Sequence, residues 1–201
     1  MGSPATSQKE AMPSEKNWPP DQGQWAVEDW LQLPDDEYRY EVIDGVLYMS
    51  PPPRARHQRI LARLVANLME FLKSESLGEV LFAPIGVRLP NQAVPIQPDI
   101  LFIKAERLDI IGEDYVEGTP DLIMEVLSPG NWLYDRREKM QLYQTAGVGE
   151  YWIVDPRADT IEVYLLEQGA YLLLGEYGLG ELAQSRVIPD FEVATDDVFP
   201  A

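Results

Sequence analysis

Two acidic residues stand in or beside apolar runs that predict buried strands. Asp99 precedes the run Ile-Leu-Phe-Ile at residues 100–103, and Glu125 lies inside Leu-Ile-Met-Glu-Val-Leu at residues 122–127. An ionised carboxylate in a buried strand loses its hydration, which is costly unless a cation or hydrogen bonds compensate it. Period-two alternation offers another interpretation, in which Glu125 faces solvent, but its neighbours on that face are apolar. The pattern favours a functional pair of carboxylates.

Such a pair suits Mg²⁺ or Mn²⁺, which keep several waters and can deliver one as hydroxide to a phosphodiester. A site of this kind also needs a cation near the attacking water or the transition-state charge. Asp135, Lys139 and Tyr143 are spaced by four residues and would share one helix face. The same spacing allows a plain surface salt bridge between Asp135 and Lys139, contributing only about 0 to 1 kcal/mol. The helix pattern alone leaves both interpretations open.

Further candidates lie nearer the N-terminus. Glu41 interrupts the apolar run at residues 40–43, and His57, the only histidine, follows three prolines at a helix start. His57 is an accessory site residue or a structural one. The start of the same helix is rich in arginines, namely Arg54, Arg56, Arg59 and Arg63. We expect the first three to contact phosphates, the alternative being a solvated helix face.

The chain has 201 residues, 45% of them hydrophobic, which is enough for one buried core. Residues 1–24 hold four prolines among polar residues and predict a flexible tail, which leaves residues 25–201 as the domain. An Asp-Gly pair between residues 38–43 and 46–50 predicts a hairpin.

Helical periodicity predicts a short helix after residue 25, a long one carrying the apolar residues 60 to 72, and another over residues 132–146. Further strands are expected at residues 80–89, 100–103, 122–127, 151–154, 161–166 and 171–174. Helices between and beside strands predict an α/β (α+β) fold with a mixed central β-sheet flanked by helices.

Composition excludes several classes of function. The absence of cysteine removes thiolate chemistry and favours the cytoplasm. One histidine and no Gly-x-Ser-x-Gly motif argue against a serine hydrolase, and no apolar run approaches the roughly 20 residues of a membrane span. A net charge of −18, from 34 acidic and 16 basic residues, argues against a nucleic-acid partner.

Three motifs connect the candidates. They are Tyr-Glu-Val-Ile-Asp-Gly at residues 40–45, Thr-Pro-Asp-Leu-Ile-Met-Glu-Val-Leu-Ser-Pro at residues 119–129, and Gly-Val-Gly-Glu-Tyr-Trp-Ile-Val-Asp-Pro at residues 147–156. With His57, Pro98-Asp99 and the Asp135, Lys139 and Tyr143 series, they resemble the Uma2 family of restriction-endonuclease-like proteins over about residues 25 to 199.

The resemblance implies the PD-(D/E)XK nuclease fold, with Asp99 and Glu125 as ligands of Mg²⁺ or Mn²⁺ and Glu41 as a third acid. In the simplest form of that motif the lysine lies two residues after the acid, where this chain has Leu127. The resemblance implies that Lys139, on the following helix, has taken this role.

We therefore expect a metal-dependent endonuclease that hydrolyses phosphodiester bonds of nucleic acid, with DNA as its partner, and that forms a homodimer. A rival hypothesis is a non-catalytic binding module that keeps the nuclease fold and uses its acidic surface for a protein partner. Since clustered carboxylates repel one another without their ion, we also expect Asp99→Asn and Glu125→Gln to be at least as stable as the parent in EDTA.

Overall fold

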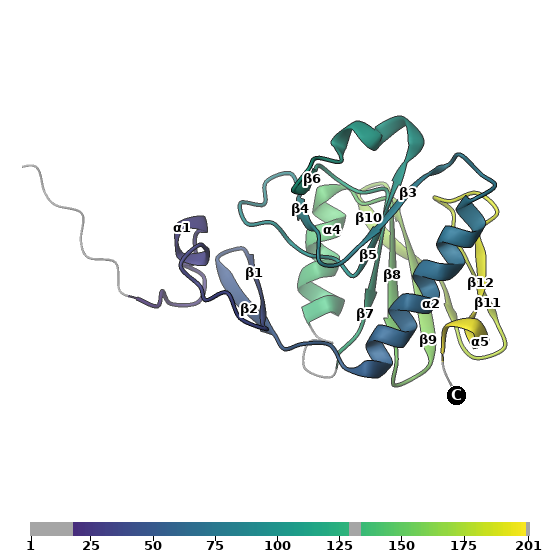
Figure 1. Ribbon diagram of the computed structural model, residues 1–201, viewed down its shortest axis with the longest axis horizontal. Coiled ribbons are helices and arrows are strands. Elements are labelled where there is room, and N and C mark those ends of the chain that lie inside the picture. The colour runs from purple at the N-terminus through teal and green to yellow at the C-terminus, as the bar shows by residue number, and fades with distance from the viewer. Residues whose placement is uncertain (1–17, 129–133, 200–201) are drawn as a thin grey trace, which may run out of the picture.

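A mixed six-stranded sheet forms the centre of the computed structural model, which describes residues 18–128 and 134–199 (Figure 1). The strand order is β10-β9-β8-β7-β5-β3, and only the β7–β8 pair is parallel. The strands are β3 (Gly78–Phe82), β5 (Ile100–Lys104), β7 (Leu122–Val126), β8 (Glu150–Asp155), β9 (Thr160–Glu167) and β10 (Ala170–Tyr177). The mixed sheet predicted from the sequence is confirmed.

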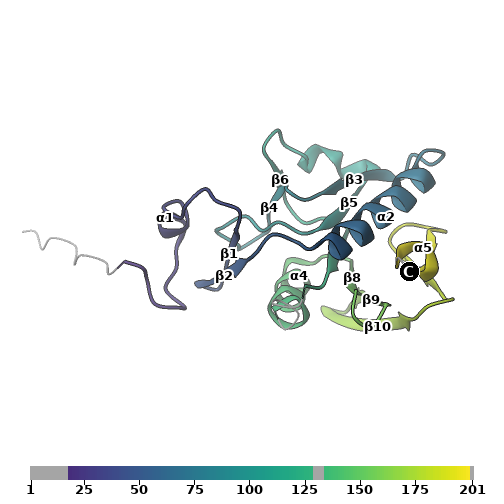
Figure 2. The same ribbon diagram turned by 60° about the horizontal axis from the view of Figure 1, so that its bottom comes forward.

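Two helices, α2 (Ala55–Leu72) and α4 (Met140–Ala146), cover opposite faces of this sheet (Figures 1 and 2). Successive strand residues point to opposite faces, so Met124 packs with the α2 side and its neighbour Ile123 with the α4 side. Both faces are thus buried, which explains the nearly continuous apolar runs of the central strands. The helices of the described residues are all too short or too polar to cross a membrane.

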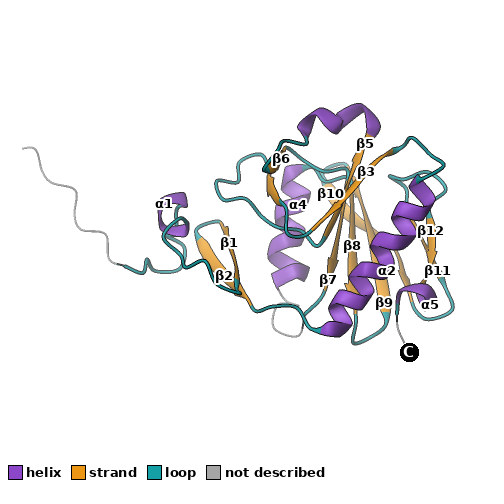
Figure 3. Ribbon diagram, in the orientation of Figure 1, coloured by secondary structure: helices purple, strands orange, loops and turns teal. Residues whose placement is uncertain are grey.

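Smaller elements surround the sheet (Figure 3). They are α1 (Val27–Trp30), β1 (Arg39–Ile43), β2 (Val46–Ser50), β4 (Gly86–Arg88), the 3₁₀ helix η1 (Ala105–Ile110), β6 (Tyr115–Glu117), the π-helix η2 (Asp135–Lys139), β11 (Leu182–Gln184), β12 (Glu192–Ala194) and α5 (Thr195–Val198). The three-residue strands β6, β11 and β12 were not predicted, because three residues are too few to show a periodicity.

The predicted hairpin is present as β1 and β2, with Asp44 and Gly45 both at positive φ in the turn. It lies to one side of the sheet with α1 (Figure 1), and a small apolar core of Trp25, Val42 and Val94 holds this part together. The turn is also tied to the preceding segment, since the N–H of Gly23 donates to the carbonyl of Gly45 over 2.8 Å. Residues 1–17, most of the expected tail, lie outside the described ranges.

Two expected elements differ from the structure. The single strand expected at residues 80–89 is wrong: it divides at Pro84 into β3, in the central sheet, and β4, which pairs with β6. Proline has no N–H to donate to a sheet and ends the first strand. The helix expected over residues 132–146 starts outside the described residues, is a π-helix over η2, and becomes regular only in α4.

Gly45→Ala should destabilise the fold more than Gly169→Ala. Gly169 has φ +83 in the β9–β10 turn, and a Cβ added there would have no atom within 4 Å. Gly169→Ala therefore costs only the strain of a left-handed backbone, about 1 to 2 kcal/mol. An added Cβ at Gly45, where φ is +74, would lie 2.6 Å from the carbonyl oxygen of Gly23. That oxygen must move, which disturbs the hydrogen bonds at the turn and costs about 1 kcal/mol more. Urea unfolding measures both losses, and equal losses would contradict the close approach.

Candidate active site

Asp99 and Glu125 occupy matching positions at the ends of two neighbouring strands. β5 and β7 are antiparallel, and their last paired residues at this end are Ile100 and Met124. One step further along the same register, residues 99 and 125 face each other. Because directly opposite residues of antiparallel strands project from the same face, the two carboxylates emerge together at the end of the sheet.

Asp99 is buried and held by three groups. Its Oδ2 accepts the backbone N–H of Val126 over 2.9 Å, and Nε2 of His57 lies 3.1 Å from the same oxygen. Nη1 of Arg39 lies 3.5 Å from Oδ1. Burial raises the pKa of Asp99. The hydrogen bond and charge of His57 and the charge of Arg39 outweigh this effect and lower the pKa from its ordinary value to about 2. An ionised Asp99 can only accept, so Nε2 of His57 carries the donated hydrogen.

Glu125 is held by two side chains from the helical segment after β7. Nζ of Lys139 and the hydroxyl of Tyr143 both donate to its Oε1, over 2.8 and 2.6 Å. Lys139 ends η2 and Tyr143 lies four residues later in α4, and the shared helix face predicted for them is confirmed. Burial, followed by the charge of Glu125, raises the pKa of Tyr143 well above its ordinary value of 10.0, so its hydroxyl stays protonated and donates.

Strand β1 brings a third carboxylate, Glu41, to the same lysine. Its Oε2 lies 3.6 Å from Nζ of Lys139 and 3.3 Å from the hydroxyl of Tyr134. Its Oε1 accepts the backbone N–H of Gln97 over 2.9 Å. Burial raises the pKa of Glu41, but the charges of Lys139 and Arg39 and the Gln97 N–H hold it below its ordinary value. Glu41 and Glu125 are therefore joined through one ammonium group.

This arrangement overturns two expectations. Lys139 is 0% exposed, so the interpretation of this lysine as part of a surface salt bridge is wrong. The side chain of Asp135, the partner in that interpretation, lies outside the described part of the chain. The premise that the carboxylates repel one another without compensation also fails, because Arg39 and Lys139 lie beside them. The fold lowers the pKa of Asp99 and of Glu41, which means that it stabilises their ionised forms. Asp99→Asn should therefore lose stability in EDTA.

A cavity of about 820 Å³ opens at this end of the sheet, and Asp99 and Glu125 line it. Four arginines, Arg39, Arg54, Arg56 and Arg157, also line it, as does the acid Glu37. Arg56 is partly engaged, since its Nη2 lies 2.5 Å from Oδ1 of Asp159. Arg54 precedes the first turn of α2, whose N-terminal N–H groups favour anions, so the cavity combines carboxylates with groups that suit phosphates.

The donor set fits a divalent ion that keeps most of its waters. Three buried carboxylates, Glu41, Asp99 and Glu125, face two permanent cations, Lys139 and Arg39, which leaves one negative charge in excess. Among the residues that the structure describes, no three acidic or histidine side chains are arranged to hold one ion together. Mg²⁺ needs only one or two carboxylates, with waters completing its shell. Asp99 and Glu125 meet that need.

One buried polar atom of the site's residues has no partner in the described protein. Nδ1 of His57 is buried and has no hydrogen-bond partner within residues 18–128 and 134–199. A buried ring nitrogen rarely stays unsatisfied, and ordered water is its usual partner in such a place.

Comparison with known proteins places the chain. The family model of Uma2, described as "Putative restriction endonuclease", matches residues 27–196. The chain belongs to the Uma2 family. A solved structure, that of "a putative nuclease belonging to DUF820 from Anabaena variabilis ATCC 29413", matches with a TM-score of 0.68 and 19% identity over 87% of this chain and 97% of that one. At this identity the likeness shows the fold, and the restriction-endonuclease-like fold predicted from the sequence is confirmed. No curated protein matches the chain.

The predicted site residues of this Uma2 chain do not all meet. His57, Asp99, Glu125, Arg54 and Arg56 line the cavity, and Tyr143, Lys139 and Glu41 lie behind it in contact with Glu125 or with one another. Arg59 is exposed and is not among the described residues that line the cavity.

Sequence reasoning missed Arg39, Tyr134 and Arg157. For Arg39 a signal existed: it stands two residues before Glu41 on a predicted strand, and period-two alternation places both on one side. Tyr134 and Arg157 reach the site only through the fold.

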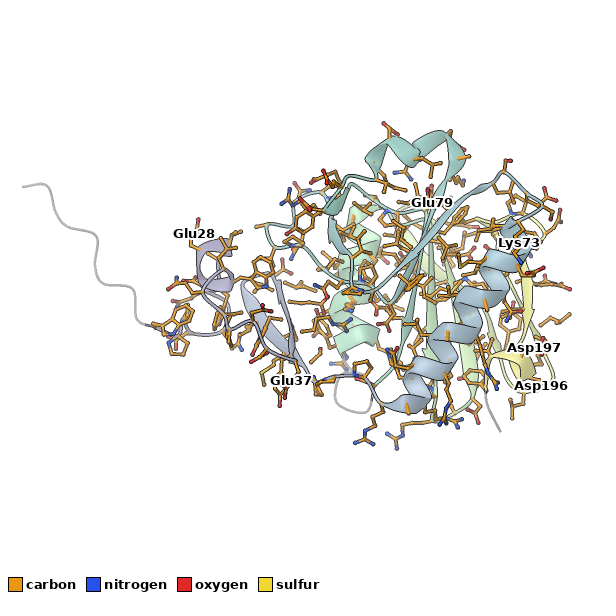
Figure 4. The ribbon with its side chains drawn as sticks, in the orientation of Figure 1. Glu28, Glu37, Lys73, Glu79, Asp196 and Asp197 are labelled. Atoms are coloured by element: carbon orange, nitrogen blue, oxygen red, sulfur yellow. The ribbon has the colours of Figure 1, made fainter. Side chains whose placement is uncertain are left out.

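Lys139→Met should destabilise the Uma2 chain by about 3 to 5 kcal/mol, because it leaves two buried carboxylates without their shared cation. The control is Lys73→Met, which removes an exposed partner of Glu70 at the molecular edge (Figure 4) and should cost about 0 to 1 kcal/mol. Urea unfolding compares them. Adding Glu125→Gln to Lys139→Met should restore part of the loss; equal effects of the two lysines would refute the buried bridge.

The pH dependence of stability should reveal Asp99. Its pKa falls from an ordinary 3.8 to about 2 on folding, so its ionised form contributes stability above about pH 4, and this contribution is lost as the pH falls towards 2. The difference in unfolding free energy between the parent and Asp99→Asn, measured in EDTA, should therefore shrink between pH 5 and pH 3. A difference that stays constant over this range would show that Asp99 acts without its charge.

Proposed function

We propose that this Uma2 chain is an endonuclease that hydrolyses phosphodiester bonds of nucleic acid, with Mg²⁺ or Mn²⁺ held by Asp99 and Glu125. One observation carries the proposal: two ionisable acids lie opposite each other at the ends of β5 and β7, in a cavity that four arginines also line. Family membership and the shared fold support it.

The chain's own residues would fix the two ligands. Val126 and His57 both hold Oδ2 of Asp99, while Lys139 and Tyr143 both hold Oε1 of Glu125. Such contacts set the direction of each carboxylate before an ion arrives, which lowers the cost of binding it. A bound Mg²⁺ or Mn²⁺ supplies a water of lowered pKa and offsets the charge that develops on the phosphate.

In this proposal Lys139 is a positioning residue, which holds the carboxylate of Glu125. It is wholly buried and is not among the described residues that line the cavity, so its ammonium acts on the substrate through Glu125. Glu41 steadies the lysine from the other side. Whether Glu41 also contacts the ion, as the family resemblance implies, stays a prediction.

Arg54 and Arg157 would bind the phosphates that flank the scissile bond, since both are exposed and line the cavity. Arg56 stands beside them, oriented by its pair with Asp159. A guanidinium can contact two phosphate oxygens at once, which orients the strand as well as attracting it. DNA as the substrate, a homodimer and a cytoplasmic location remain the predictions drawn from the sequence.

The test is cleavage of labelled DNA and RNA at low salt in Mg²⁺, Mn²⁺ or EDTA. Cleavage should require the ion and should vanish in Asp99→Asn and Glu125→Gln. The matched control is Asp121→Asn, which changes an acid just before the opposite end of β7 that pairs with Arg107 over 2.7 Å. It should keep most of the activity. Loss of cleavage in all three variants would point to the fold and away from the site.

Ion binding is measured separately by unfolding. At a hundredfold excess over its dissociation constant, Mg²⁺ or Mn²⁺ should stabilise the parent by roughly 2.7 kcal/mol and Asp99→Asn by much less. A parent that binds the ion but cleaves no nucleic acid would favour the rival binding module, and a parent indifferent to the ion would refute the site.

A further inference from the structure

The carboxylates of the candidate site lie deep in their cavity. Asp99 is 4% exposed and Glu125 is 1% exposed, although both line a space of about 820 Å³. A phosphodiester must enter this space to reach them. Cavities of about 300 to 1,000 Å³ hold ligands of drug size, which is the scale of one or two nucleotides. A DNA duplex is too wide to enter such a space, since its major groove alone is about 12 Å wide.

An exposed aromatic side chain forms part of the cavity wall. Phe82, at the end of β3, lines the cavity and is 46% exposed. The chain fixes it near the acids, because the next residue, Ala83, donates its N–H to the carbonyl of Asp99 over 3.0 Å. The exposed Pro84 continues the same wall. An aromatic face beside a phosphate-binding rim is the combination that stacks an unpaired base while arginines hold its backbone.

The charge distribution limits how much nucleic acid the protein can contact. Glu37 lines the cavity, but other exposed acidic residues lie at well-separated places on the molecule, as Glu28, Glu79 and Asp196 show in Figure 4. Duplex binders neutralise many phosphates over a long basic surface. Here four of the arginines, Arg39, Arg54, Arg56 and Arg157, line the cavity, which suits a short stretch of one strand.

We propose that the cavity takes an unpaired nucleotide of a single-stranded segment, with its base stacked on Phe82 and its phosphate directed towards Asp99 and Glu125. This inference rests on the proposed nuclease function and names its substrate class. A paired base would first have to leave the duplex, which costs the free energy of unpairing and unstacking it. Strand ends, flaps and loops avoid that cost.

Binding is measured by fluorescence anisotropy in Ca²⁺ with three labelled DNAs of one sequence: a 12-nucleotide single strand, its blunt duplex, and the duplex with an unpaired tail. The parent should bind the single strand and the tailed duplex at least about tenfold more tightly than the blunt duplex. Phe82→Ala should weaken single-strand binding at least about fivefold and leave blunt-duplex binding unchanged, since stacking contributes about 1 to 3 kcal/mol per base.

Phe82→Trp keeps a stacking surface and should retain the affinity. Met69→Ala, which removes another side chain that is 52% exposed but lies on α2 outside the cavity lining, is the matched control and should change nothing. Equal binding of single strand and duplex, or equal effects of Phe82→Ala and Met69→Ala, would overturn the inference.

Cleavage in Mn²⁺ separates this inference from the function on which it rests. Cleavage of blunt duplex without preference for unpaired strands would overturn the inference and leave the nuclease. Tight, Phe82-dependent binding of single strands without any cleavage would overturn the nuclease function and leave the inference about the bound nucleotide. No binding to any of the three DNAs would overturn both.

Discussion

Lys139 lies wholly buried between Glu125 and Glu41, 2.8 and 3.6 Å from their oxygens, and three separate segments must meet for this group of charges to be compensated. β7 supplies one acid, the β1–β2 hairpin supplies the other, and η2 supplies the cation. Removing the lysine leaves two buried carboxylates without their shared cation, which is among the costliest defects in a fold. The hairpin, which has its own small core, is thus tied to the sheet by electrostatics. The π-helical turn that carries Lys139 is a rare conformation that is frequent at functional sites, in keeping with a segment placed by its partners more than by its local propensity.

Local signals account for what the sequence could predict. The Asp44-Gly45 turn, the three-and-four spacing along α2 and the apolar runs of the central strands each depend on neighbours within a few residues, and each is present. Pro84, which ends β3, is a local signal of the same kind. The burial of Lys139 was beyond such reasoning, because it depends on Glu41, almost a hundred residues away, and a lysine on a helix is ordinarily solvated. Two acids in apolar surroundings indicated that a compensating group must exist, and only the fold identifies Lys139 and Arg39 together as that group.

The net charge of −18 and a basic cavity are compatible, because charges act over limited distances in salt solution. At 0.1 M ionic strength the Debye length is about 10 Å, so an incoming phosphate responds mainly to the groups nearest to it. At the cavity these include Arg54 and Arg157, while distant acids such as Glu28 on α1 are screened. Overall charge therefore decides solubility and the long-range approach of a ligand, whereas local charge decides what the site holds.

The contacts that orient the carboxylates of the site also compete with a metal ion for them. In the structure Asp99 already has compensating partners in Arg39 and His57, so the fold does not need an ion to neutralise it. An ion bound as proposed must share or displace those partners, and the positive charge that Arg39 and Lys139 bring near it opposes its binding. The affinity for Mg²⁺ or Mn²⁺ is then the difference between two large terms, the gain from the carboxylates and the loss from these neighbours. Such a balance favours an ion that arrives with a phosphate, because the substrate's negative charge offsets the cations that otherwise repel it.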